Sequence, residues 1–213
     1  MSNVPVGYKQ TDVGVIPEDW EVKPLGEVLK IRHGKSQHEV ICRDGKYPIL
    51  ATGGEIGRTN TALYSKPSVL IGRKGTIDVP RFMDSPFWTV DTLFFSELSD
   101  KVEPKFIFYK FCLVDWYSYN EASGVPSLNA ATIEKIPQPL PPTLTEQTAI
   151  ATALSDVDAL LNQLDKLIAK KRDIKQATMQ QLLTGKKRLA GFSGEWEVKK
   201  LGDIAPLQRG FDL

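Results

Sequence analysis

The stretch TEQTAIATALSDVDALLNQLDKLIAKKRDIKQATMQQLLT, from Thr145 to Thr184, contains no proline or glycine and decides the architecture of the chain. Its apolar residues recur at alternating spacings of four and three, which is typical of a coiled-coil seam. The seam consists of Ile150, Leu154, Val157, Leu161, Leu164 and Ile168. Thr145 is suited to cap the start of a helix, and Gly185 follows its end. The pattern predicts one helix of about 39 residues, roughly 58 Å long at about 1.5 Å per residue.

This helix is expected to need a partner helix, in the same chain or in another. Beyond Ile168 the seam positions are occupied by Lys171 and Lys175, while a neighbouring row continues through Leu160, Leu167 and Ile174. The apolar stripe therefore drifts around the helix, as a 3.6-residue period does against a 3.5-residue repeat. A single stripe on a lone helix is not stable in water. The alternative, a helix lying across its own domain, is disfavoured because such helices rarely exceed about 25 residues.

The residues before this helix have a different pattern. From Trp20 to Ile136, short apolar runs alternate with Gly, Pro and Asn, which indicates strands and turns. The clearest predicted strands are 47–50, 68–71 and 92–95. The spacing of Phe106, Tyr109, Leu113 and Trp116 predicts one packed helix within 105–119. Phe87, Trp88 and Trp116 are expected in the core, with stacking on a ligand as the minor alternative.

Residues 136–142 carry four prolines and predict a stiff connector, because each proline ring fixes φ and removes a hydrogen-bond donor. The fold class expected is α+β: a mixed α/β domain followed by a long, coiled-coil-forming helix.

The segment Trp20–Val28 reappears as Trp196–Ile204, and the match continues in register until Gly34 falls on Gly210. The distance between the two copies far exceeds the roughly 20–50 residues of solenoid repeats, so it indicates a duplicated domain. We expect a first domain at 1–142, a spacer and dimerisation helix at 143–185, and the start of a second repeat unit at 186–213.

The charge is nearly balanced overall but not locally. The net charge is +1, whereas the stretch from Lys30 to Arg81 has ten basic and four acidic residues. Such a local excess is compatible with a polyanionic partner. The two cysteines form neither a CxxC pair nor a disulfide framework, and no run approaches the roughly 18 apolar residues of a membrane span. A cytoplasmic protein without membrane contact is expected.

Patterns for other chemistry are weak. The Pro141–Pro142 pair lacks the preceding Asn or Asp and the following aromatic of an adenine methyltransferase loop. Gly34-Lys35-Ser36 matches the end of a phosphate-binding loop, but the upstream glycine is replaced by Leu29. Glu103-Pro104-Lys105 is too short a pattern to indicate a nuclease, and His33 and His38 have no cysteine cluster beside them. We expect no catalytic residue, no metal and no cofactor in this chain.

Candidate nucleic-acid contacts lie in glycine-containing turns of the basic stretch. Arginine, lysine and asparagine suit base edges and phosphates, and glycine lets the backbone approach a phosphate. A plain solvated turn is the alternative for each residue. Ser127 belongs to a second loop, for which a helix-capping turn with Asn129 is an equal alternative. The candidates are Arg32, His33, Lys35, Arg58, Asn60, Arg73, Lys74, Thr76 and Ser127.

Four segments occur in an order that resembles one known family. They are the entry segment Tyr8–Trp20, the exit segment from Ser127 through Ile136–Pro137 and Leu140–Pro142 to Gln147, the helix end Gln180–Lys186, and the restart at Trp196. In this order they resemble the specificity subunits of type I restriction-modification systems, over nearly the whole chain.

The resemblance implies two target recognition domains, each reading half of a split double-stranded DNA site, held apart by two antiparallel helices. This chain departs from that plan, since it has one such domain, one spacer helix and the opening of the next domain. It resembles a half-length form that rebuilds the two-fold arrangement as a homodimer. The implied partners are a DNA methyltransferase subunit, which carries S-adenosylmethionine, and a restriction subunit. The alternative is a truncated coiled-coil interaction or assembly protein without sequence-specific DNA binding.

Overall fold

The computed structural model describes residues 4–205, which form two units that divide between Asp156 and Val157. The first unit contains all the strands and the first turns of the long helix. The second contains the rest of that helix and the segment after it. The register match at Gly210, and the end of the expected second repeat unit at 206–213, lie outside the described residues.

A four-stranded antiparallel sheet forms the centre of the first unit, with the order β4, β11, β8, β9. A second four-stranded sheet has the order β10, β6, β7, β5, in which only β10 and β6 are parallel. The strands of the first sheet are β4 (Leu29–Arg32), β8 (Ser68–Gly72), β9 (Arg81–Met83) and β11 (Leu93–Leu98). Those of the second are β5 (Ile41–Cys42), β6 (Tyr47–Ala51), β7 (Gly54–Thr59) and β10 (Trp88–Thr89). The predicted strands at 47–50, 68–71 and 92–95 are confirmed.

Both faces of the central sheet are covered, and the alternation of side chains along β8 shows how. Val69 and Ile71 pack into a large core with the helices, whereas Leu70 packs on the other face with Phe87 and Phe95. Successive side chains of a strand point to opposite faces, so a strand buried on both sides reads as a continuous apolar run.

The helices of the first unit cover one face of this sheet. They are a 3₁₀ turn at Leu25–Glu27, α1 (Pro104–Leu113), a second 3₁₀ turn at Trp116–Tyr119, and α2 (Ala130–Lys135). Phe106 and Trp116 are buried as expected, and so are Phe87 and Trp88. The expected single helix over 105–119 is wrong in its second half. Leu113 is 80% exposed, because α1 ends there and the chain turns before Trp116.

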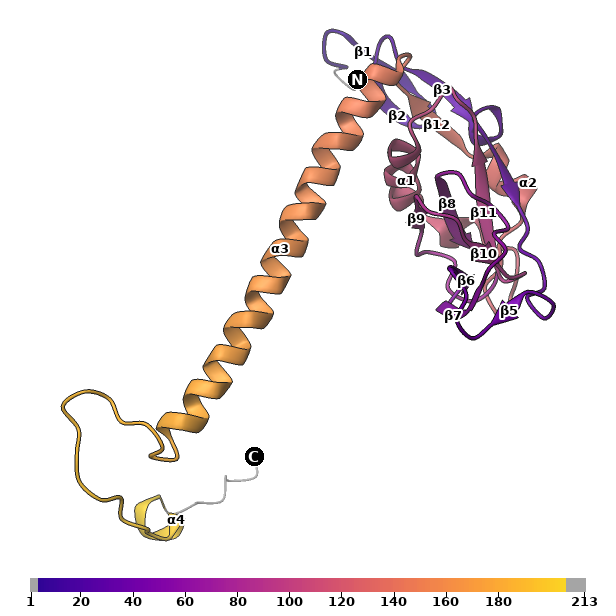
Figure 1. The fold of residues 1–213 in the computed structure, drawn as a ribbon. Coiled ribbons are helices and arrows are strands. Elements are labelled where there is room, and N and C mark those ends of the chain that lie inside the picture. Colours follow the sequence, from indigo (N-terminus) through magenta and orange to yellow (C-terminus); the bar gives the residue numbers. More distant parts are fainter. Residues whose placement is uncertain (1–3, 206–213) are drawn as a thin grey trace. The chain divides into compact units, whose positions relative to one another are not determined.

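The proline-rich connector is more ordered than expected. Pro137–Leu140 forms strand β12, which pairs with β3 (Glu21–Pro24) in a two-stranded sheet. Such a sheet has only edges, where proline is tolerated because no second neighbour needs its missing N–H. A second two-stranded sheet pairs β1 (Tyr8–Thr11) with β2 (Gly14–Pro17). Figure 1 shows these pairs near the start of α3, with β5, β6 and β7 at the opposite end of the first unit.

The long helix α3 runs from Leu144 to Leu182 and has 39 residues, as the apolar spacing predicted. Its N-cap is Thr143 rather than Thr145, since the Thr143 hydroxyl accepts a hydrogen bond from the Glu146 N–H. Gly185 follows its end with φ of +70°, a conformation that favours glycine. Within the first unit, the first turns are fixed by Gln147, whose side chain accepts from the Glu103 N–H and donates to the Pro141 carbonyl.

A short helix, α4 (Leu201–Ile204), lies in the copied segment. Among the helices of residues 4–205, none is long and apolar enough to cross a membrane. The same residues contain no group of three or more His, Cys, Asp or Glu side chains arranged to hold a metal ion.

Candidate nucleic-acid interface

Several loops of the first unit meet at one edge of the central sheet. Because β11 is antiparallel to β4 and β8, the end of β4, the end of β8 and the start of β11 share that edge. The register places Arg32 opposite Phe95 and Gly72 opposite Leu93. The loops that follow β4 and β8, and the loop that precedes β11, are therefore neighbours. We call this side of the unit the loop edge.

The Thr92 carbonyl ties these loops together. It accepts hydrogen bonds from the N–H groups of Arg73 and Lys74, at 2.9 and 3.3 Å, and from the Thr52 hydroxyl. The Thr52 carbonyl in turn accepts from Arg81 Nη2 at 2.9 Å. The turn between β6 and β7 is thus joined to the loop edge, and Arg73 and Lys74 lie on a backbone that is fixed from several sides.

A further segment, residues 120–129, is pinned beside the loop after β8. Lys74 and Ser127 form an isolated β-bridge, and the Leu128 N–H donates to the Arg73 carbonyl at 2.9 Å. The Gly75 N–H donates to the Pro126 carbonyl at 2.9 Å. Gly75 has φ of +89°, a backbone conformation that side chains disfavour, so this turn favours glycine.

A polar cavity of about 260 Å³ opens between these segments, and we call it the loop pocket. Of the predicted contact residues, it brings together His33, Arg73, Lys74 and Ser127. Their contact with DNA stays a prediction. The full lining is His33, Arg73, Lys74, Phe94, Glu121, Ser127, Leu128, Asn129 and Ala130.

The two cations of the pocket have different surroundings. The Arg73 guanidinium forms an ion pair with Asp91. Lys74 is exposed, and its ammonium has no ion-pair partner within residues 4–205. An ammonium without a partner is available to a phosphate, whereas Arg73 has a fixed position at the pocket wall.

The loop after β4 approaches the sheet too closely for any residue but glycine at its start. A Cβ atom on Gly34 would lie 2.1 Å from the Val90 carbonyl oxygen. The next residue, Lys35, donates its N–H to the Thr89 carbonyl at 2.8 Å, and its own carbonyl accepts from Trp88 Nε1 at 2.9 Å. The Lys35 side chain remains exposed. His33 rests edge-on against Phe94, with ring centroids 4.9 Å apart.

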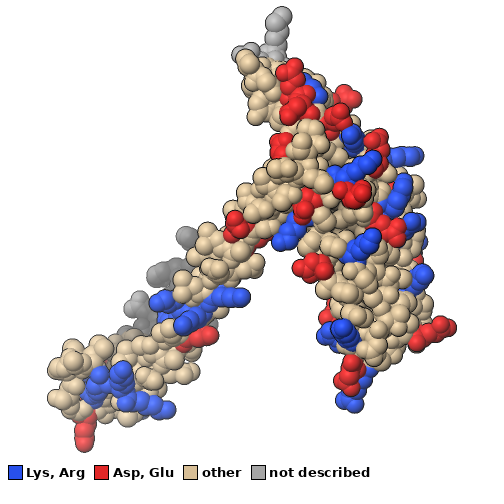
Figure 2. Space-filling model, turned by 45° about the horizontal axis from the view of Figure 1, so that its top comes forward, with Lys and Arg blue, Asp and Glu red and all other residues tan. Residues whose placement is uncertain are grey.

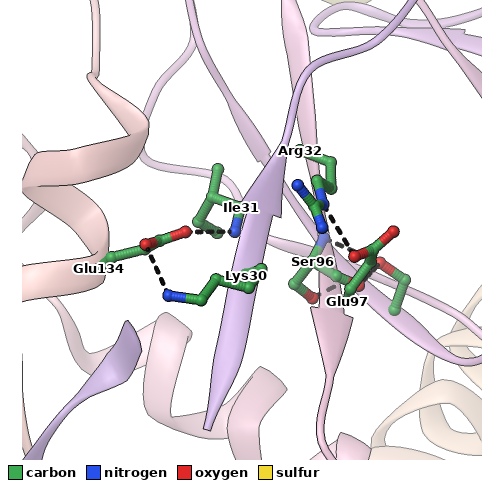
Figure 3. Close-up of polar contacts among 7 residues, drawn as sticks. Lys30, Ile31, Arg32, Ser96, Glu97 and Glu134 are labelled. Carbon is green, nitrogen blue, oxygen red and sulfur yellow. Dashed lines mark hydrogen bonds and ion pairs between the residues drawn. The ribbon is translucent and has the colours of Figure 1, made fainter. Parts of the chain in front are cut away.

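Glu134 holds α2 against the outer edge of β4, as Figure 3 shows. Its carboxylate accepts from the Ile31 N–H at 2.9 Å and contacts Lys30 Nζ at 3.2 Å. α2 follows directly after the segment that carries Ser127 and is capped by the Asn129 side chain, which accepts from the Ala131 N–H. The helix-capping role that the sequence offered for Asn129 is therefore confirmed. The contact between Glu134 and β4 fixes the position of α2, and with it the Asn129 side of the loop pocket, relative to the central sheet.

Five predicted residues do not line the pocket: Arg32, Lys35, Arg58, Asn60 and Thr76. Arg32 pairs with Glu97 at 2.8 Å, in the view of Figure 3. Thr76 is exposed on the loop after β8 but outside the pocket lining. Arg58 donates to the carbonyls of Gly45 and Lys46, at 2.9 and 3.2 Å.

Asn60 lies beside Arg58 and accepts from the Lys46 N–H at 3.1 Å. In the β6–β7 pair, Tyr47 lies opposite Thr59, so Arg58 and Asn60 are at the end away from the Ala51–Gly54 turn. Arg58 and Asn60 belong to the same basic stretch of sequence as the pocket residues, but the β6–β7 hairpin places them away from the loop pocket.

Glu121 and Asn120 are residues that the sequence did not suggest. The loop pocket contains Glu121, and Asn120 organises the loop around it. A search for basic residues does not find Glu121, because its side chain is a carboxylate. The only available signal was the Ser123-Gly124 turn next to Ser127. Figure 2 shows basic and acidic side chains interspersed over the surface of the first unit that it presents, so charge alone does not delimit an interface there.

Comparisons with known proteins agree with the geometry of this unit. The type I restriction-modification DNA specificity domain matches residues 17–176. The chain is 27% identical over 220 residues to the type I restriction enzyme MjaVIII specificity subunit of Methanocaldococcus jannaschii. This alignment covers 92% of this chain and 51% of that protein. It is 26% identical to the putative MjaX specificity subunit of the same organism, over 92% of this chain and 55% of that protein.

A solved structure has the same fold. The crystal structure of the type I restriction-modification S subunit from M. genitalium superposes with a TM-score of 0.62 at 21% identity, over 76% of this chain and 45% of that one. The chain spans about half the length of the relatives that it matches. Through the domain at 17–176, this chain belongs to the family of type I restriction-modification specificity subunits.

Proposed function

We propose that this chain is a non-catalytic DNA-recognition subunit that reads one half of a bipartite site and scaffolds a DNA methyltransferase. The loop pocket carries this proposal. It combines hydrogen-bond donors and acceptors on a rigid backbone, in a domain of the DNA specificity family. Base edges present such mixed patterns of donors and acceptors, whereas phosphates accept only. In this proposal residues 1–142 read DNA, the helix at 143–185 is spacer and dimer contact, and 186–213 begin a second repeat unit.

The proposed partners follow from the family. We infer that a methyltransferase subunit docks on this chain and performs the chemistry, and that a restriction subunit joins the complex. Names of related proteins support this inference, since they are specificity subunits of type I restriction enzymes. The proposed location is the cytoplasm, where such an enzyme meets DNA.

We further infer that two copies pair through α3. Ile150 packs partly against the core of the first unit, so the open part of the seam begins at Leu154. From there to Met179 the apolar side chains are between 41% and 55% exposed. A helix with this much apolar surface in water gains from burying it against a second helix. The exposed side chains are Leu154, Val157, Leu160, Leu161, Leu164, Leu167, Ile168, Ile174 and Met179.

The charges of α3 favour an antiparallel second copy as the occupant. From Leu144 to Asp165 the helix has four acidic residues and no basic one; from Lys166 to Leu182 it has five basic residues and one acidic one. Figure 2 shows Lys and Arg side chains grouped along the C-terminal part of the helix. The sign changes near the middle of the exposed stripe. Antiparallel pairing sets each acidic half against a basic half, whereas parallel pairing opposes like charges.

A selection from random duplexes at fixed salt tests the proposed function. The chain is assembled with its methyltransferase subunit, and the bound DNA is sequenced. We expect an enriched motif made of two short elements with a fixed gap. Binding that depends on salt but enriches no motif would contradict the proposal and favour the alternative, an assembly protein without sequence-specific DNA binding.

A further inference from the structure

Glu121 is a carboxylate in a pocket whose other ionisable side chains are basic or histidine. A carboxylate at a DNA-facing surface repels the phosphate backbone, so a site built only for phosphate would exclude it. Glu121 nevertheless lines the loop pocket. A carboxylate at this position favours a ligand group that donates a hydrogen bond.

The loop that carries Glu121 is closed by Asn120. The Asn120 side-chain oxygen accepts from the N–H groups of Ala122 and Ser127, at 3.1 and 2.9 Å, and its amide nitrogen donates to the Ala122 carbonyl at 2.8 Å. The Glu121 N–H donates to the Ser127 carbonyl at 3.0 Å. The loop is therefore fixed at both ends, and the position of Glu121 does not depend on a ligand.

One of the two carboxylate oxygens of Glu121 has a hydrogen-bond partner. Oε1 accepts a hydrogen bond from the Thr132 hydroxyl, which links the carboxylate to α2. Among residues 4–205, Oε2 has no hydrogen-bond partner. An ionised carboxylate only accepts hydrogen bonds, so the remaining oxygen selects a donor.

The donors that duplex DNA offers at base edges are exocyclic amino groups. In the major groove these are cytosine N4 and adenine N6; guanine and thymine present acceptors there. Lys74 in the same pocket offsets the negative charge of Glu121, while Asp91 neutralises Arg73, so the carboxylate does not leave the pocket negatively charged. The pocket thus contains an acceptor for one base edge beside donors for the neighbouring groups.

From this arrangement we propose that Glu121 is a specificity-determining residue, which accepts a hydrogen bond from the exocyclic amino group of one cytosine or adenine in the half-site. The inference rests on the proposed function, because it requires that the loop pocket faces DNA. Its role is discrimination, since each guanine or thymine at that position would leave a carboxylate facing an acceptor.

The test compares selections by the wild-type chain and by Glu121→Ala, both in complex with the methyltransferase subunit. We expect Glu121→Ala to weaken the preference at a single position of the half-site by roughly 5- to 150-fold and to leave the other positions unchanged. The base that loses its preference distinguishes cytosine from adenine. Affinity for random duplex should rise, because a negative charge has been removed; a merely structural residue would not produce this opposite pair of effects.

Two further variants keep the result interpretable. Glu121→Gln preserves the size of the side chain and its contact with Thr132, and it should also change preference at that one position. Asp84→Asn removes the same charge from an exposed residue that follows β9. This residue lies beside the start of β8, away from the loop edge, so the motif should stay unchanged. A wild-type motif that both Glu121 variants retain at every position would overturn the inference. No motif with the wild-type chain would overturn the proposed function, and this inference with it.

Discussion

At the scale of single residues, Lys74 is the lysine of the loop pocket, and its ammonium has no ion-pair partner among residues 4–205. Lys74→Ala should weaken binding to all sequences alike and flatten the salt dependence by about one counterion, because one phosphate contact is lost. Affinity of the assembled complex at several salt concentrations measures both. Lys66→Ala is the matched control, since Lys66 is exposed before β8, at its other end. A salt slope equal to that of the wild type would remove Lys74 from the interface.

Arg58 should behave differently, although it comes from the same basic stretch. Its guanidinium donates to two backbone carbonyls, so Arg58→Ala should lower the free energy of unfolding by about 1–2 kcal/mol. Denaturant unfolding measures this, and the selected DNA motif is expected to stay the same. A changed motif with unchanged stability would place Arg58 in the reading surface instead.

The contrast between these residues shows what the sequence could predict about the site. Arg73 and Lys74 follow a fully buried strand and precede a glycine, and that local pattern was enough to find them. Arg58 also lies near glycines in the basic stretch, but it is inside strand β7, and its partners Gly45 and Lys46 come from the other side of a hairpin. Glu121 carries the wrong sign for a search based on positive charge. Tertiary contacts, among them the bridge between Lys74 and Ser127, bring Glu121 into the pocket.

At the scale of elements, the spacing of apolar residues predicted the long helix, whose structure depends on neighbours in the chain. It failed for the helix at 105–119, whose end is decided by tertiary contacts. The spacing of apolar residues predicted α3 closely: the helix begins at Leu144, with Thr143 rather than Thr145 as its N-cap. The same reasoning joined Leu113 and Trp116 into one helix. The structure ends α1 at Leu113, so that Trp116 can be buried by a separate turn.

The exposed seam of α3 gives a direct prediction about assembly. The double substitution Leu161→Asp and Leu164→Asp should raise the dimer dissociation constant at least about 100-fold, because unpaired charges in a seam are strongly unfavourable. Light scattering across a concentration series measures it. The matched control is Ala159→Asp with Gln163→Asp, on the opposite side of the helix. A wild-type chain that stays monomeric at high micromolar concentration would contradict the proposed pairing.

Salt distinguishes the two possible orientations of the helices. With acidic halves against basic halves, attraction between charges supports the dimer, so raising the salt from about 50 mM to about 1 M should weaken it. In a parallel dimer like charges would oppose one another, and the same change should strengthen it. Sedimentation equilibrium at the two salt concentrations therefore tests the antiparallel arrangement without any substitution.

At the scale of the whole molecule, a symmetric dimer fixes the form of the DNA site. Two identical domains related by a two-fold axis read the same bases on opposite strands, so the homodimer should select an inverted repeat with a non-specific gap. A helix of roughly 58 Å corresponds to about 17 base pairs at about 3.4 Å each, which sets the scale of the half-site separation. The gap itself should be shorter, because each domain covers several base pairs.

Deleting one heptad, Leu161–Leu167, tests whether α3 sets this separation. Seven residues shorten a helix by about 10.5 Å, or about three base pairs, and turn its end by only about 20°, so each domain keeps its orientation on the helix. The preferred gap should therefore change while the half-site bases stay the same. Methylation mapping on a library of gap lengths measures both. Asymmetric half-sites with this chain as the only reader would contradict the homodimer, and an unchanged gap after the deletion would show that another element sets the distance.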